Sequence, residues 1–152
     1  MVLNRQRKAK VNVRGAAALS RKLGKLLGLG ERYFNVCFVD DDQIRELNAA
    51  YRHKPKPTDV LSFPWKPGSE LNPDVSRALA DPEGEFKGFL GDVVISAETA
   101  RRNAEAEGHA PATEISWLIL HGLLHLLGMD HERDGGEMLS LEHDLRRRLG
   151  LC

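Results

Sequence analysis

The sequence predicts a single α+β domain, because strand-like segments come early along the chain and helical segments accumulate towards its end. The chain has 152 residues, of which 41% are hydrophobic and 29% charged, which is the composition of a globular protein with one core. We therefore expect residues 1–152 to form one domain, with neither repeats nor low-complexity segments.

Four segments are expected to form strands. The clearest is Tyr33–Val39, which is rich in aromatic and β-branched residues. Prolines precede a strand at Asp59–Phe63, and Pro64 ends it. The other two expected strands are Lys10–Val13 and Phe89–Ile95.

Five segments carry helical signals, namely leucines at helical spacing, capping residues and a proline in a first turn. The helix over Ile115–Leu127 is apolar on nearly every side, so we expect it to be central and buried. Residues 65–86 are rich in proline and glycine and are expected to form a long connection. Asp40 or Asp41 is expected to cap a helix that runs to about Tyr51, and Ser96 a helix that runs to about Glu107. The other expected helices span Gly15–Leu29 and about Glu137–Leu149.

Charge is distributed unevenly, although the net charge is zero. Residues 1–35 contain nine basic residues and one acidic residue, Glu31, which indicates either a basic face for an anionic partner or a solvated surface. Two isolated cysteines, Cys37 and Cys152, favour a reducing cytoplasm. We expect neither a secretory signal, nor a membrane-spanning segment, nor a nucleotide cofactor.

Three histidines lie at the spacing of a metal site, in the segment HGLLHLLGMDH. His121 and His125 are four residues apart, so a helix places them on one face. Gly128 can adopt the left-handed conformation that ends a helix, and the chain can then return His131 to the same ion. Three imidazoles leave a fourth position for water, as in catalytic zinc sites. The alternative is that the histidines are ordinary core residues bonded to carbonyls.

The same spacing occurs in the H-E-x-x-H-x-x-G-x-x-H motif of metzincin proteases. These enzymes place their general base, a glutamate, directly after the first histidine, where this chain has Gly122. Loss of a positioned base costs on the order of 10²–10⁴ in rate. The sequence therefore argues against peptide hydrolysis by that mechanism.

The histidine segment resembles the H-G-x-x-H-L-x-G-x-D-H signature of the YbeY family, which are single-strand-specific endoribonucleases of bacterial rRNA maturation. Two more segments agree with that family. LNAAYRHKPKPTDVLSFP, over Leu47–Pro64, is similar to its Asn-x-x-Tyr-Arg block, and LGDVVIS, over Leu90–Ser96, is similar to one of its strands.

The resemblance implies a mostly parallel, four-stranded sheet with about five helices, one of them buried and carrying the metal ligands. It implies one zinc ion on His121, His125 and His131, and an important arginine at Arg52. It also implies action on the 3′ end of small-subunit rRNA and on defective ribosomes. The implied partners are the small ribosomal subunit and assembly factors.

Two further side chains are candidates from their positions. The guanidinium of Arg52 could neutralise charge on a reacting phosphate, or it could be a surface group paired with an acid such as Asp59. Asp130 directly precedes the third histidine, so it could accept a hydrogen bond from a ligating imidazole or bond the turn backbone.

Three functions are therefore compared. The first is a metal-dependent endoribonuclease, in which the ion acts on water or the scissile phosphate and Arg52 offsets charge. The second is a metallopeptidase-like zinc hydrolase, which Gly122 disfavours. The third is a non-catalytic ribosome-assembly factor whose zinc only holds the helix and the following turn together.

Overall fold

A four-stranded mixed sheet forms the centre of the protein in the computed structural model, which describes residues 1–65, 88–130 and 135–151. The strand order is β1-β2-β4-β3. β1 pairs with β2 and β2 with β4 in parallel, whereas β3 is an edge strand antiparallel to β4. The strands span Val2–Asn4 (β1), Tyr33–Val39 (β2), Val60–Pro64 (β3) and Phe89–Ser96 (β4).

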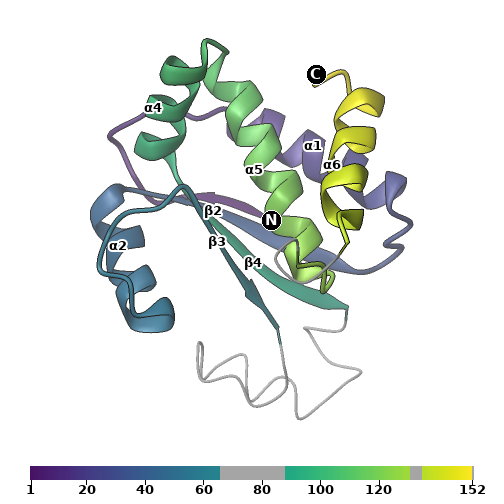
Figure 1. The fold of residues 1–152 in the computed structure, drawn as a ribbon, viewed down its shortest axis with the longest axis horizontal. Coiled ribbons are helices and arrows are strands. Elements are labelled where there is room, and N and C mark those ends of the chain that lie inside the picture. The colour runs from purple at the N-terminus through teal and green to yellow at the C-terminus, as the bar shows by residue number, and fades with distance from the viewer. Residues whose placement is uncertain (66–87, 131–134, 152) are drawn as a thin grey trace.

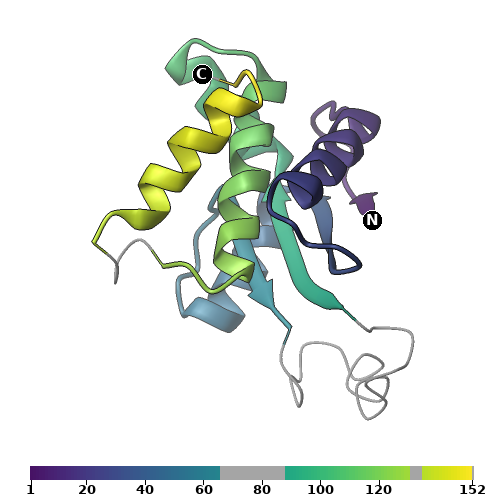
Figure 2. The ribbon, with the colours of Figure 1, turned by 90° about the vertical axis from the view of Figure 1, so that its right-hand side faces the viewer.

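Helices cover both faces of this sheet (Figure 1). Ile44 of α2 packs with Val94 of β4, whereas the neighbouring Val93 and Ile95 belong to the larger core with α1, α5 and α6. Figure 2 shows α5 between α1 and α6. The helices within the described residues are α1 (Val13–Leu26), α2 (Asp41–Arg52), α4 (Ala97–Glu107), α5 (Pro111–Leu126) and α6 (Glu137–Arg148).

The predicted fold class is confirmed, including the mostly parallel sheet and the buried central helix. Ile119, Leu120, Leu123 and Leu124 of α5 are fully buried. None of the helices in the described ranges is long and apolar enough to cross a membrane. The predicted connection at 65–86 lies almost wholly outside the described residues.

The first strand was predicted in the wrong place. The strand lies at Val2–Asn4, and residues 10–12 are irregular before α1 begins at Val13. The reason is local capping, because the Asn12 side chain accepts a hydrogen bond from the backbone N–H of Gly15 and starts the helix there. β1 has only three residues and is specified by pairing with β2, which a local pattern does not reveal.

Asp41 ties α2 to α4. Its Oδ1 accepts hydrogen bonds from the hydroxyls of Ser96 and Thr99, both at 2.6 Å, and its Oδ2 accepts one from Arg102 at 2.7 Å. Burial alone would raise the pKa of Asp41, but these three hydrogen bonds outweigh it and hold the pKa below its ordinary value. Ser96 also caps α4 through Thr99, as its position before the helix predicted.

Candidate metal and active site

His121 and His125 lie one turn apart near the end of α5, and their side chains converge. The two Nε2 atoms are 3.1 Å apart, and the ring centroids are 4.6 Å apart. Two nitrogens on one tetrahedral zinc ion, with bonds near 2.1 Å, are about 3.4 Å apart. The two imidazoles are therefore placed to share one ion with little movement.

The chain turns directly after these histidines, as Gly128 predicted. Gly128 has a positive φ of 92°, and its N–H donates to the carbonyl of His125 at 3.0 Å. The N–H of Met129 donates to Leu124 at 3.1 Å, which completes the end of the helix. The third predicted ligand, His131, lies outside the described residues.

α5 packs closely against the sheet at Gly122. A Cβ at this position would lie 2.6 and 2.9 Å from the two methyl groups of Val93, and 3.2 Å from Oγ of Ser62. The Ser62 hydroxyl also donates to the Gly122 carbonyl at 3.1 Å. The position that carries the general base in metzincins therefore faces the sheet here, and a glutamate side chain has no room in it.

A carboxylate that the sequence analysis did not identify contacts the first histidine. Oε1 of Glu142, from α6, lies 2.5 Å from Nδ1 of His121. Glu142 is only 6% exposed, and burial would raise its pKa, but the bond and charge of His121 and the charge of Arg146 keep that pKa below its ordinary value. Its helical spacing from Met138 and Leu145 could have indicated that Glu142 is buried, because all three residues lie on the buried side of α6.

Arg52 is the last residue of α2 and is exposed. Its neighbour Tyr51 packs edge-on against Phe63 of the edge strand β3, with ring centroids 5.4 Å apart. In Figure 1, α2, β3 and α5 all end towards the lower part of the molecule. Arg52 and the histidines are therefore at the same end of the fold, although α2 and α5 cover opposite faces of the sheet.

Asp130 is partly buried and follows the Gly128 turn, at the end of a described segment. Its contact with a ligating imidazole stays a prediction.

A second group at the other end of α5 could also hold a metal ion. His109 Nε2 lies 2.7 Å from a Glu114 carboxylate oxygen and 3.5 Å from one of Glu107. The ligand atoms of all three residues lie within 4.8 Å of one another. Spacing in the sequence gave no sign of this group, because Glu107 and His109 lie at and beyond the end of α4 whereas Glu114 is on α5.

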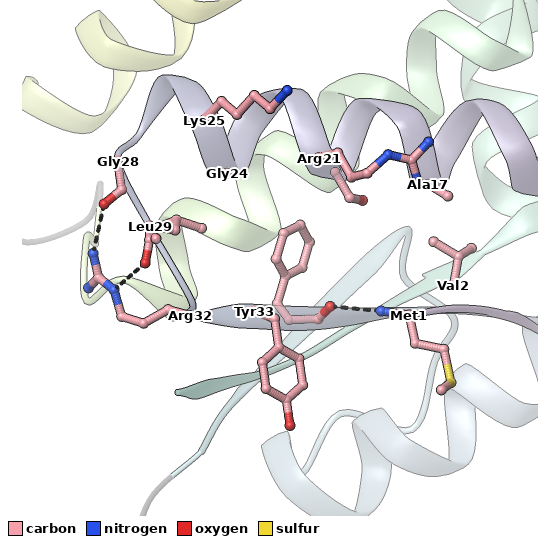
Figure 3. A pocket seen from close by; sticks show the side chains of 13 residues that line it. Met1, Val2, Ala17, Arg21, Gly24, Lys25, Gly28, Leu29, Arg32 and Tyr33 are labelled. Carbon is pink, nitrogen blue, oxygen red and sulfur yellow. Dashed lines mark hydrogen bonds between the residues drawn. The ribbon is translucent and has the colours of Figure 1, made fainter. Parts of the chain in front are cut away.

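A basic pocket of about 750 Å³ lies between α1 and β2, away from the histidines (Figure 3). Its cationic residues are Arg21, Lys25 and Arg32. The Arg32 guanidinium donates to the carbonyls of Leu29 at 3.1 Å and Gly28 at 3.5 Å. Three of the nine basic residues of the segment 1–35 therefore line this pocket.

Known proteins resemble this chain over most of its length. The family model for endoribonuclease YbeY matches residues 2–150. The endoribonuclease YbeY of Nautilia profundicola is 42% identical over 123 residues, which cover 81% of this chain and 76% of that protein. The endoribonuclease YbeY of Aquifex aeolicus is 49% identical over 111 residues, which cover 73% of this chain and 64% of that protein.

The fold also matches a solved structure. The solution structure of TM1509 from Thermotoga maritima aligns with a TM-score of 0.59 and 26% identity, over 95% of this chain and 85% of that one. The match of the family model over nearly the whole sequence, together with these relatives, shows that the chain belongs to the YbeY endoribonuclease family.

Proposed function

We propose that this protein is a zinc-dependent endoribonuclease that cuts single-stranded RNA, and that it matures the 3′ end of small-subunit rRNA and acts in ribosome quality control in the cytoplasm. The observation that carries the proposal is the convergence of His121 and His125, with Nε2 atoms 3.1 Å apart, in a member of an endoribonuclease family. Its partners would be the small ribosomal subunit and assembly factors.

The donor set fits one zinc ion. Imidazole nitrogens suit zinc, and His131, three residues beyond Gly128, would supply the third ligand. When bound, zinc would polarise a phosphoryl oxygen and lower the pKa of a water molecule. Asp130, directly before His131, would orient a ligating imidazole or hold the turn.

Arg52 would act on the substrate rather than on the metal. A guanidinium suits phosphate oxygens, because its planar array of donors can bond two oxygens at once. The single RNA strand would lie along the edge strand β3, between the end of α2 and the end of α5. Arg52 would then offset the negative charge that builds up on the scissile phosphate.

The two alternative functions are less well supported. A metallopeptidase of the metzincin type needs a glutamate where Val93 and Ser62 leave room only for glycine. A purely structural zinc does not account for membership of an endoribonuclease family.

The test measures metal content and RNA cleavage on the same purified proteins. The variants are His121→Ala, His125→Ala and Arg52→Ala, with the exposed His143→Ala as the matched control. We expect the wild type to hold one zinc ion and to cut single-stranded but not duplex RNA. His121→Ala and His125→Ala should lose both zinc and cleavage, Arg52→Ala should lose cleavage alone, and His143→Ala should lose neither.

Two outcomes would contradict the proposal. Cleavage that survives in His121→Ala and His125→Ala after both variants have lost the metal would rule out a catalytic zinc. A folded, zinc-loaded wild type that binds ribosomal subunits but cuts no RNA would favour the assembly factor.

A further inference from the structure

We propose that Glu142 is a positioning residue for the metal site, whose carboxylate holds His121 in the tautomer that presents Nε2 to the ion. The inference rests on the proposed zinc site and extends it to a residue on a different helix.

The two ring nitrogens of His121 face different partners. Nδ1 lies 2.5 Å from Oε1 of Glu142, whereas Nε2 lies 3.1 Å from Nε2 of His125. An ionised carboxylate can only accept a hydrogen bond, so Nδ1 must carry the proton. In the neutral ring, Nε2 then has the lone pair, and it is this atom that points to the convergence with His125.

Glu142 is itself held in place. Its side chain is 7% exposed, and its second oxygen lies 3.6 Å from the guanidinium of Arg146, one turn further along α6. That guanidinium lies over the ring of Trp117, 4.3 Å from the centroid, and the indole N–H donates to the carbonyl of Leu151 at 2.9 Å. Trp117 is on α5, one turn before His121, so α5 and α6 fix the carboxylate together.

The loss of metal affinity on removing such a partner has a typical size. A carboxylate bonded to a ligating histidine orients the ring and raises its basicity as a ligand, and losing it typically costs 10–100-fold in metal affinity. We expect Glu142→Ala to weaken zinc binding by about that factor. Glu142→Gln should weaken it less, because the amide oxygen still accepts a hydrogen bond from Nδ1 but carries no charge.

The experiment has two readouts, and neither involves RNA. One is the zinc Kd, measured by competition with a chelator. The other is the nitrogen NMR spectrum of His121 in the metal-free protein, which reports where the ring proton resides. The matched control is Asp144→Asn, because Asp144 is on the same helix but its side chain is 39% exposed and pairs with Arg147 and Arg148.

We expect the wild type and Asp144→Asn to show the Nδ1–H tautomer and the same Kd. Glu142→Ala should show a mixture of tautomers together with its weaker binding. If Glu142→Ala does not fold, the isosteric Glu142→Gln decides, through its Kd and its Nδ1 proton shift. Unchanged Kd and an unchanged tautomer in a folded Glu142 variant would overturn the inference. A wild type that binds zinc but cuts no RNA would instead refute the proposed function and leave these results intact.

Discussion

Gly122 offers the sharpest test of how the fold positions the candidate site. Gly122→Ala adds one methyl group on the side of α5 that faces the sheet, 2.6 and 2.9 Å from the methyl groups of Val93. These distances are too short for carbon atoms, and both contacts are with a β-branched residue of a central strand, which cannot swing away. The helix or the strand must therefore shift.

The size of the effect follows from two opposing terms. Overpacking a core costs about 1–3 kcal/mol. Alanine is a better helix former than glycine by about 1 kcal/mol, which offsets part of that cost. We expect Gly122→Ala to lower the free energy of unfolding by up to about 2 kcal/mol, although the same change on an open helix face raises it.

Urea unfolding measures this free energy, and Gly24→Ala is the matched control. Gly24 lies inside α1, and its added methyl would meet only a Leu29 methyl at 4.0 Å, so this variant should be more stable by about 0.5–1 kcal/mol. Val93→Ala should relieve the clash. The loss of stability in the double variant Gly122→Ala/Val93→Ala should therefore be smaller than the sum of the losses in the two single variants. Stabilisation by Gly122→Ala, or strict additivity with Val93→Ala, would refute the close-approach reasoning.

Three further outcomes are expected. Asp41→Asn should cost about 1–2 kcal/mol at pH 7, because hydrogen bonds to a charged group are worth more than neutral ones. The pKa of Asp41 is lowered in the folded protein, so its contribution to stability is present above the ordinary pKa of an aspartate and is lost as the pH falls through the lower, folded pKa. Thermal unfolding should show the difference in stability between wild type and Asp41→Asn becoming smaller over that range. A constant difference would contradict this. Arg52→Ala should leave the zinc Kd and the melting temperature unchanged, while the rate of single-turnover RNA cleavage falls by about 10²–10³-fold, as when one charge-stabilising donor is lost. Loss of zinc binding along with cleavage would refute the role of Arg52 on the substrate. If the basic pocket contacts RNA, Arg21→Ala and Lys25→Ala should each weaken binding of every RNA sequence alike and lower the salt slope by about one unit. Salt titrations by fluorescence anisotropy would show this, and unchanged slopes would exclude the pocket as an RNA contact.

Local sequence signals predicted most of the fold, because residues within or next to most helices and strands mark where these elements begin and end. Ser96 caps α4 as its side chain indicated, Asp40 is the one of the two expected caps that begins α2, and the apolar run of α5 could only be buried. β1 was misplaced because its three residues are defined by pairing with β2, and no local pattern records that partner.

The candidate site likewise contains some features that local sequence could predict and others that it could not. His121, His125 and Gly128 could be found because one helix and its end bring them together. Spacing on α6 could indicate that Glu142 is buried, but not that it contacts His121, because that contact spans 21 residues and depends on how α6 packs against α5. The packing reason for Gly122 was equally hidden, since it depends on Val93 of a distant strand.

The contacts among Trp117, Arg146 and Glu142 would make α6 part of the proposed metal site. Because Glu142 contacts His121 only when α6 is docked, the part of the metal-binding free energy that depends on Glu142 would also stabilise the docking of α6. Linkage is reciprocal, so metal binding should slow the exchange of backbone amide hydrogens along α6. Conversely, a substitution that loosens α6 far from the histidines should lower the affinity for the metal. The end of the chain would then report whether the site is filled.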